Sequence, residues 1–442
     1  MQQCDDAVAV APHGDFGSGE RRPSRGPGCV RPDRPPLDAA PEPGWSTAGV
    51  RLFVLVLAAF QVAQGVADTI PFGNVRFTES YYLVTYNHGF VRRGLLGEGL
   101  RLLFGAPTRS EVDGTADLIV ALAVGAVLVT CELLIRRRTR SSFAMAILLV
   151  ASPFALDFFI VDRRPDLLGI VLLVALGIAL VRVEEALLPW LVGFGIAFAA
   201  LVLVHEDVIL IQIPWALVLV AVATLGRAGR TGEDQGPATT RVLAVRLSAV
   251  VAPSVVAIIA VLAYGLPSGQ KVARLEQDVS SFHLSGNTVF TYLPESIHAA
   301  VNLVGAIPLD GKVRTLFLGF VLVALQLVWV TAWVRPRLGR VFIESGQRAL
   351  GVGLGAVVVA ATVVLFGTGF DWLRWFADCG ASWLVVLAFA ALLAPPEHVD
   401  SPPPARVHLS PWLPALAVYL ALVPPLDVLY VTSELKHFLL LV

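Results

Sequence analysis

Two long apolar runs separated by five polar residues decide the fold: SFAMAILLVASPFALDFFIVDRRPDLLGIVLLVALGIALVRV, residues 142–183. A helix needs about 20 mainly apolar residues to cross a bilayer. The runs at 142–161 and 166–183 approach this length, and the polar sequence DRRPD, Asp162 to Asp166, lies between them. The stretch therefore predicts two membrane-spanning helices joined by a short turn.

The same pattern recurs along most of the chain. Apolar runs of near-spanning length lie at about 50–67, 116–135, 142–161, 166–183, 188–204, 208–225, 246–265, 313–334, 348–367, 380–394 and 411–426. The composition agrees, because 56% of the 442 residues are hydrophobic and 15% are charged, whereas soluble domains have about 25% charged residues. We expect an all-α, polytopic integral membrane protein of about 11 transmembrane helices (roughly 10–12).

The N-terminal segment differs from the rest. Residues 1–45 are rich in Pro, Gly, Asp and Arg and contain almost no aliphatic run. Such a segment cannot bury enough apolar surface to offset its ordering entropy, so we expect a disordered tail. Residues 46–442 then form the helical transmembrane domain.

Basic residues in the short loops predict the orientation. The sequence RRRTR, Arg136 to Arg140, and several other arginines follow every second apolar run. Because short cytoplasmic loops carry an excess of Lys and Arg, we expect the N-terminus to be cytoplasmic and the protein to lie in the cell membrane. Two long loops, 68–115 and 266–312, then face outward.

Three short turns with dense charge also face outward in this topology. They are DRRPD, HED (His205 to Asp207) and DWLRW (Asp371 to Trp375). The inner loops are mostly basic, Pro- and Gly-rich connectors such as PPEHVDSPPPAR. We therefore expect binding or chemistry on the outer face.

The first outer loop contains GFVRRGLLGEGLRLLFG, in which regularly placed charges alternate with leucines. This pattern is typical of a helix that lies in the membrane interface. Arg92 and Arg93 precede it, and arginine suits bidentate recognition of a lipid phosphate or pyrophosphate. The alternative is an amphipathic anchor whose arginines meet ordinary anionic headgroups.

The charged turns have a functional and a structural interpretation each. Arg163 and Arg164 are unusual on an outer turn, because basic residues are expected on the cytoplasmic side, and this suggests a function. The structural alternative is that they form local ion pairs with nearby aspartates. His205, Glu206 and Asp207 could act as a general base or as ligands of a divalent cation, or form a solvated turn. Asp371 and Arg374 can pair at i, i+3. Trp372 suits an aromatic belt at the membrane interface or a platform for stacking a sugar.

These pieces together resemble the GT-C class of membrane glycosyltransferases and the related bacterial envelope polysaccharide polymerases. GFVRRGLLG, RPDLLG, the HE pair and DWLRW carry the resemblance, which covers about residues 50–430. It implies a sugar donor on a polyprenyl phosphate, a glycan acceptor, contact with membrane lipid and no nucleic-acid partner. Many GT-C enzymes have an adjacent acidic pair in the first outer loop, and this sequence has none there.

The resemblance also implies roles for individual residues. A carboxylate would remove the acceptor proton, with Glu79 or Asp68 as the first candidates, and arginines would hold the phosphate. The catalytic candidates are Glu79, Asp68, Glu206 and Asp371, and the candidates for substrate and phosphate binding are Arg92, Arg93, Arg163, Arg164, Asp166, His205, Trp372 and Arg374. No resident metal site is assigned, and a divalent cation is a further option.

Two other functions fit the same sequence. A transporter of lipid-linked glycan or solute would line its pathway with buried charges, although such proteins often show internal repeats. A non-catalytic assembly protein of the envelope would use its outer arginines to bind anionic lipid.

Overall fold

The computed structural model describes residues 44–72, 75–183, 187–231, 237–284, 288–296, 299, 301–302, 342, 346–368, 372–393 and 412–422. These residues are mainly helical, and no β-strand forms among them. The helices in chain order are α1 (Thr47–Phe72), α2 (Val75–Tyr81), α3 (Leu95–Phe104), α4 (Arg109–Arg136), α5 (Arg140–Ala151), α6 (Leu156–Asp162), α7 (Leu167–Arg182), α8 (Leu187–Val204), α9 (Val208–Thr231), α10 (Pro237–Tyr264), α11 (Gly269–Asp278), the 3-10 helix η1 (Ser280–Phe282), α12 (Val289–Tyr292), α15 (Arg348–Thr368), α16 (Trp372–Leu393) and α17 (Trp412–Leu422).

Ten of the predicted spans coincide with helices of the described residues. Eight segments are long and apolar enough to cross a membrane: Thr47–Ala67, Arg109–Arg136, Arg140–Asp162, Leu187–Val204, Val208–Ala228, Ala238–Tyr264, Arg348–Thr368 and Arg374–Leu393. Helices α7 and α17 are shorter but also apolar. The predicted span at 313–334 lies outside the described residues. The prediction of an all-α, multi-pass membrane protein is confirmed.

Local capping explains why α4 begins at Arg109 rather than near residue 116. The Thr108 hydroxyl accepts a hydrogen bond from the Glu111 N–H at 3.4 Å, and the Glu111 carboxylate accepts one from the Thr108 N–H at 2.6 Å. This reciprocal capping box satisfies two backbone donors at the helix start. The polar first turns therefore join the helix, although hydropathy alone does not include them.

The apolar run at 142–161 forms two helices rather than one. Helix α5 ends at Ala151 and α6 begins at Leu156. Pro153 lies between them, and proline has no N–H for a helical hydrogen bond. Helix α6 ends at Asp162, and the next residue, Arg163, has a φ of 51° in the left-handed region that commonly terminates helices.

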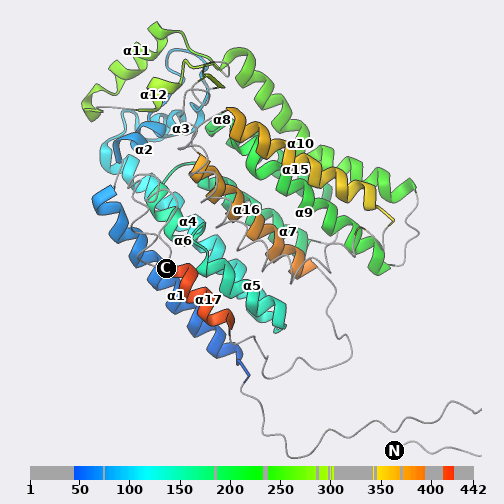
Figure 1. The fold of residues 1–442 in the computed structure, drawn as a ribbon. Coiled ribbons are helices and arrows are strands. Elements are labelled where there is room, and N and C mark those ends of the chain that lie inside the picture. Colours follow the sequence, from blue (N-terminus) through cyan, green and yellow to red (C-terminus); the bar gives the residue numbers. More distant parts are fainter. Residues whose placement is uncertain are drawn as a thin grey trace, which may run out of the picture. The chain divides into compact units, whose positions relative to one another are not determined.

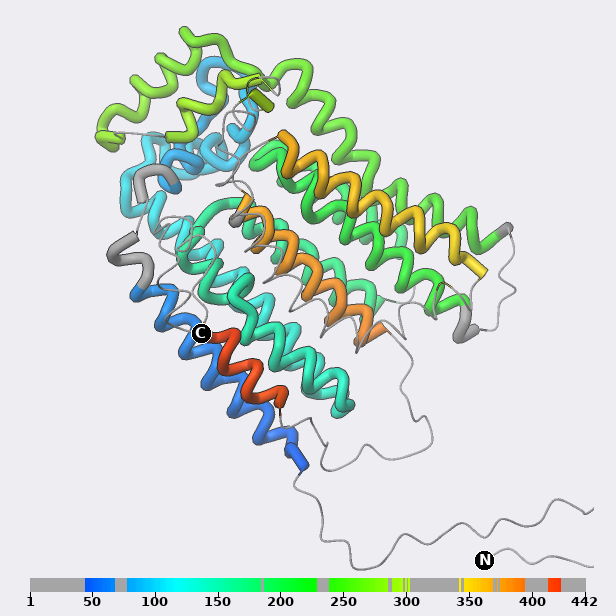
Figure 2. The backbone as a smooth tube through the Cα atoms, viewed as in Figure 1, coloured from blue at the N-terminus to red at the C-terminus, as the bar shows by residue number. Residues whose placement is uncertain are grey.

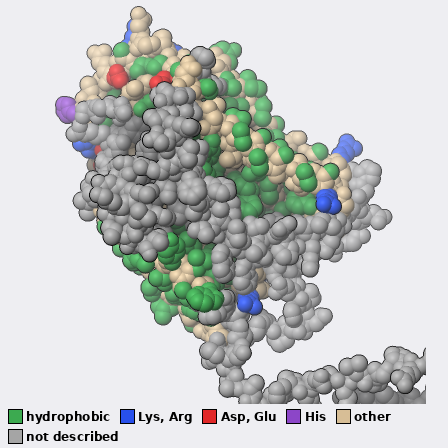
Figure 3. All heavy atoms as spheres, viewed as in Figure 1, with side chains coloured by type: hydrophobic (Ala, Val, Ile, Leu, Met, Phe, Trp, Pro, Cys, Tyr) green, Lys and Arg blue, Asp and Glu red, His purple; other side chains and the backbone are tan. Residues whose placement is uncertain are grey.

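The interior of the helical bundle is formed by α5, α7, α9 and α16. Helix α16 packs against the other three, and α9 also packs against α7. In α16, 78% of the most apolar segment is buried inside the protein, whereas in α15 only 11% is buried. Helix α15 therefore lies on the flank of the bundle. Figures 1 and 2 show α1 and α17 side by side at another edge of the bundle. On the face drawn in Figure 3, hydrophobic side chains cover much of the described flank, as expected for a surface in lipid.

Short helices of the two predicted outer loops gather at one end of the bundle. Helices α2 and α3 lie there beside α11 and α12 (Figures 1 and 2). The Val289 N–H donates to the Ser80 hydroxyl at 2.9 Å, and Arg109 donates to the Phe282 carbonyl at 2.9 Å. His88 pairs with Asp278 at 3.1 Å. Hydrogen bonds and an ion pair therefore connect the described parts of the two loops into one layer.

Helix α3 has the amphipathic character expected from the sequence. Gly97 and Leu100 are buried, whereas Leu102, Leu103 and Phe104 are exposed. Its location in the membrane interface stays a prediction, as does the orientation of the chain in the bilayer.

Candidate functional site

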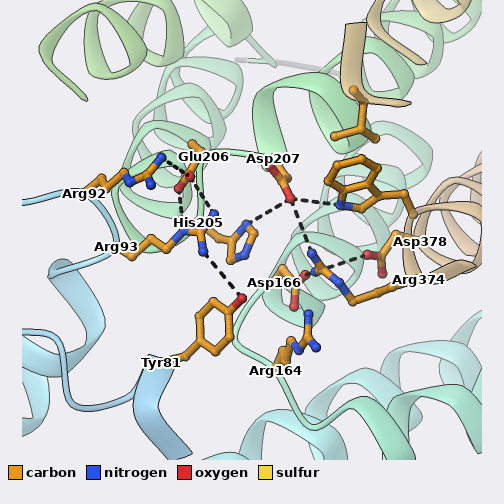
Figure 4. Close-up of polar contacts among 12 residues, drawn as sticks. Tyr81, Arg92, Arg93, Arg164, Asp166, His205, Glu206, Asp207, Arg374 and Asp378 are labelled. Atoms are coloured by element: carbon orange, nitrogen blue, oxygen red, sulfur yellow. Dashed lines mark hydrogen bonds and ion pairs between the residues drawn. The ribbon is translucent and has the colours of Figure 1, made fainter. Parts of the chain in front are cut away.

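Four segments that are distant in sequence bring charged side chains together at this end of the bundle. They are the loop before α3, the turn between α6 and α7, the turn between α8 and α9, and the start of α16 (Figure 4). The close-up shows arginines and carboxylates alternating across the junction. We call the residues labelled in Figure 4 the outer cluster, after the face on which the sequence predicts them to lie: Tyr81, Arg92, Arg93, Arg164, Asp166, His205, Glu206, Asp207, Arg374 and Asp378.

A two-point ion pair in the outer cluster joins Arg93 to Glu206. The Arg93 Nε donates to Glu206 Oε2 at 2.9 Å, and its Nη2 donates to Oε1 at 2.6 Å. Such two-point pairs are the strongest form of the arginine–carboxylate interaction. Arg93 has a left-handed φ of 63°, so the pair is made by a residue in an uncommon backbone conformation.

Arg92 connects the same carboxylate to the second outer loop. Its Nη1 lies 3.4 Å from Glu206 Oε1, and its Nε donates to the Leu293 carbonyl at 3.1 Å. A further hydrogen bond goes to the Tyr292 carbonyl at the end of α12. Arg92 therefore ties α12 to the turn that carries Glu206.

Arg374 is surrounded by three carboxylates at the other side of the outer cluster. One guanidinium nitrogen pairs with Asp166 and lies 3.8 Å from Asp378, and the other lies 3.5 Å from Asp207. The Trp375 indole N–H also donates to Asp207 at 3.0 Å. These contacts hold the start of α16 against the starts of α7 and α9.

His205 and Tyr81 lie in the middle of the outer cluster, with Arg92 and Arg93 on one side and Arg164 and Arg374 on the other (Figure 4). Their rings stack with centroids 5.6 Å apart, and the His205 side chain is fully buried. His205 Nδ1 lies 3.6 Å from Asp207. The guanidinium groups of Arg93 and Arg164 both lie within 5.5 Å of the Tyr81 ring centroid, close enough for cation–π attraction.

The charges of the outer cluster shift the titration of its members. Burial alone would raise the pKa of Glu206, but Arg93 and Arg92 outweigh it and hold that pKa well below the ordinary 4.5. Burial and the positive charge of Arg93 lower the pKa of His205 below 6.5. At neutral pH Glu206 is therefore ionised and the neighbouring His205 is neutral.

Three predicted site residues lie elsewhere in the structure. Glu79 is buried and 3.4 Å from Arg109, and burial raises its pKa. Arg163 pairs with the exposed Asp117 at 2.7 Å. Trp372 is buried, and its indole N–H donates to the Phe366 carbonyl at 2.9 Å.

The remaining predicted site residues lie either in the outer cluster or outside the described residues. The outer cluster contains Arg92, Arg93, Arg164, Asp166, His205, Glu206 and Arg374. Asp371 and the side chain of Asp68 lie outside the described residues. Within the described residues, Arg164 makes the local pair with Asp162 that the sequence suggested, at 3.3 Å.

Sequence analysis missed Asp378 as a site candidate and assigned no role to Tyr81. Asp207 belongs to the HED triplet, and its role follows only from the approach of α16. Asp378 had a stronger signal, since it is a carboxylate within an otherwise apolar run, where ionisable residues are costly and usually functional.

Among the described residues, no three His, Cys, Asp or Glu side chains converge in a way that could hold a metal ion.

Known proteins similar to this chain are mycobacterial. The chain is 27% identical over 370 residues to the uncharacterized protein Rv1490 of Mycobacterium tuberculosis (strain ATCC 25618 / H37Rv), covering 78% of this chain and 82% of the relative. The uncharacterized protein Mb1527 of Mycobacterium bovis matches with the same identity and coverage. No solved structure matches.

A family model matches the part of the chain that contains most of the outer cluster. It is described as uncharacterised membrane protein Rv1490 and matches residues 47–273, from the start of α1 into α11. The chain therefore belongs to the family of the uncharacterised membrane protein Rv1490.

Proposed function

We propose that this protein is a membrane glycosyltransferase or polysaccharide polymerase that takes its sugar from a polyprenyl phosphate at the outer face of the membrane. The observation that carries the proposal is the convergence of Arg92 and Arg93 on Glu206, at the end of the bundle that we predict to face outward. Two adjacent guanidinium groups suit a phosphate, and the carboxylate beside them suits an acceptor hydroxyl.

In the proposed reaction, the donor phosphate takes the place of Glu206 as partner of the two arginines. The pKa of Glu206 then rises toward its ordinary value, because the charges that depress it have a new partner. The freed carboxylate accepts the proton of the acceptor hydroxyl.

The acceptor oxygen then forms a bond to the anomeric carbon while the bond from that carbon to the phosphate oxygen breaks. Polyprenyl phosphate leaves with the electron pair, and Arg92 and Arg93 stabilise its negative charge. This assignment replaces Glu79 by Glu206 as the base, since Glu79 is paired with Arg109 instead.

Sugar transfer by purified protein in lipid nanodiscs tests the proposal. The assay uses radiolabelled polyprenyl-phosphate sugars and a crude envelope acceptor. We expect Glu206→Gln to lower the transfer rate about 100-fold or more, as is usual for loss of a general base. Arg136→Lys is the control, because its side chain is 68% exposed and pairs with Glu132 outside the outer cluster. Absence of transfer by the wild type from every donor would contradict the proposal.

A non-catalytic role in envelope assembly is the second candidate. It is favoured by the fact that Arg93 and Glu206 already satisfy each other with two hydrogen bonds. The exchange Arg93→Glu with Glu206→Arg separates the two functions. A purely structural pair retains much of its stabilisation after the exchange, whereas phosphate recognition at position 93 is lost.

A further inference from the structure

A buried polar stripe continues from the outer cluster into α16. Arg374, Asp378 and Ser382 are spaced four residues apart and therefore lie on one face of the helix. Their exposed fractions are 2%, 1% and 0%. The stripe spans about 12 Å along the helix, at 1.5 Å per residue.

Helix α9 runs parallel to α16 and brings an amide to the level of this stripe. Asp207 accepts a hydrogen bond from Trp375, and the rings of Trp215 and Trp383 are 4.7 Å apart. Both pairs have the same sequence offset of 168 residues. Gln212 of α9 therefore lies at the height of α16 residues 378–382, and its side chain is 1% exposed.

Helix α7 completes a three-helix junction around the stripe. A side chain at Gly169 would put its Cβ 2.7 Å from Cδ of Gln212, so the absence of a side chain there makes room for the amide. Asp166, which pairs with Arg374, lies one turn before Gly169. Each of α7, α9 and α16 packs against the other two.

Four oxygen atoms at this junction have no hydrogen-bond partner among the described residues. They are Asp166 Oδ1, Gln212 Oε1, Asp378 Oδ2 and Ser382 Oγ. All four belong to side chains of residues that are at most 2% exposed. Leaving a buried oxygen atom without a hydrogen bond is costly, so four such atoms at one junction point to a ligand.

The formal charges of the surrounding residues indicate whether that ligand is positively or negatively charged. Arg92, Arg93 and Arg374 face four carboxylates, those of Asp166, Glu206, Asp207 and Asp378. One negative charge is in excess when all are ionised. Arg164 does not change this balance, because it pairs with Asp162.

We infer that the junction of α7, α9 and α16 binds an alkali cation through oxygen atoms of Asp166, Gln212, Asp378 and Ser382. Oxygen atoms of carboxylate, amide and hydroxyl groups are the ligands that hard cations take in proteins. A single positive charge neutralises the one excess negative charge of the outer cluster. The inference does not depend on the proposed transferase activity.

The choice of a monovalent ion follows from the ligand set. Only two carboxylates contribute to the junction, and Arg374 contacts both of them. The local excess is therefore one negative charge. A divalent ion would leave a buried positive charge, which is costly without a partner.

Thermal unfolding of the full-length protein in nanodiscs tests the inference. The salts are sodium, potassium or choline chloride at one ionic strength, so that screening is constant. A ligand that binds only the folded state raises the melting temperature in a saturable way. We expect sodium or potassium to raise it by a few degrees relative to choline.

Variants locate the effect. Asp378→Asn and Ser382→Ala should abolish the response to alkali ions, and Asp378→Asn should retain its fold in choline because it removes the excess charge. Ser254→Ala is the matched control, since Ser254 of α10 is also a buried serine without a hydrogen-bond partner among the described residues but lies on another helix. It should keep the response.

Three outcomes would overturn the inference. The melting temperature could be the same in all three salts, it could respond only to Mg²⁺ or Ca²⁺ when these are added to the choline sample, or both Asp378→Asn and Ser382→Ala could keep the full alkali response. Equilibrium binding of ²²Na⁺ or ⁸⁶Rb⁺ to the wild type gives a second measurement that does not depend on the folding of a variant.

Discussion

Arg93 and Glu206 are 113 residues apart in sequence and form a two-point ion pair, with Nε–Oε2 and Nη2–Oε1 distances of 2.9 and 2.6 Å. The pair joins the first outer loop to the turn between α8 and α9. Both side chains are less than one-fifth exposed. The carboxylate of a distant turn therefore helps to hold the loop before α3 in position.

Removal of that carboxylate should destabilise the protein. Glu206→Gln leaves Arg93 mostly buried without its anion, and we expect a loss of about 2–4 kcal/mol in the free energy of unfolding. The measurement is denaturant or thermal unfolding in a mild detergent. The double variant Arg93→Met with Glu206→Gln serves as control and should recover part of the loss, because no unpaired charge remains. A loss below about 0.5 kcal/mol in the single variant would mean that the pair contributes little.

Acid should weaken the same contact. The folded-state pKa of Glu206 lies below the ordinary value of 4.5, so its contribution to stability is complete above pH 4.5. It is lost as the pH falls through the folded-state pKa. We expect the melting temperature of the wild type to fall below about pH 4.5, and Glu206→Gln to show a shallower fall. Equal slopes for the two proteins would place the acid sensitivity in other carboxylates.

Much of the fold follows from the sequence, because membrane spans are set by local hydropathy. Ten apolar runs coincide with described helices, including the short α7. The boundaries were less accurate where capping decides them, as at Thr108 and Glu111 of α4. The break at Pro153 was also missed, since a hydropathy pattern does not register one missing N–H.

The site was predicted less completely. The sequence singled out charged turns whose side chains meet in the structure, because arginines on a turn predicted to face outward are unusual. It could not indicate which charges meet, and it paired Arg374 with Asp371, whereas within the described residues Arg374 contacts Asp166, Asp207 and Asp378. Such pairings depend on the packing of α7, α9 and α16, which no local pattern encodes.

Two glycines of α3 should respond differently to a methyl group. A Cβ at Gly97 would lie 2.0 Å from the Val84 carbonyl oxygen, which is backbone and cannot rotate away. We expect Gly97→Ala to destabilise the protein by about 2 kcal/mol or more, as for an overpacked core position. Gly99→Ala is the control, because nothing lies within 4 Å of its Cβ. It should be neutral or stabilising by up to about 1 kcal/mol through helix propensity. Equal effects on the melting temperature would contradict the packing of α3 described above.

Neighbouring arginines after α4 should also differ. Arg138 has a left-handed φ of 53°, so Arg138→Gly should stabilise the protein by about 1 kcal/mol. Arg137 has an ordinary φ of −73° and donates to the Ala391 carbonyl at the end of α16 at 2.5 Å. Arg137→Gly should therefore destabilise by about 1–2 kcal/mol. Unfolding curves of both variants check the difference in sign, and the same sign for both would contradict it.

The measurement that tests the central claim most directly is equilibrium binding of a polyprenyl phosphate to the purified protein in nanodiscs. The proteins compared are the wild type, Arg92→Lys with Arg93→Lys, and the control Arg136→Lys. The account predicts saturable binding to the wild type and the control, and an affinity lower by tenfold or more in the double variant, because lysine cannot form the two-point contact. Equal affinity in all three proteins would mean that ordinary headgroup attraction explains the binding and would contradict a phosphate site at Arg92 and Arg93.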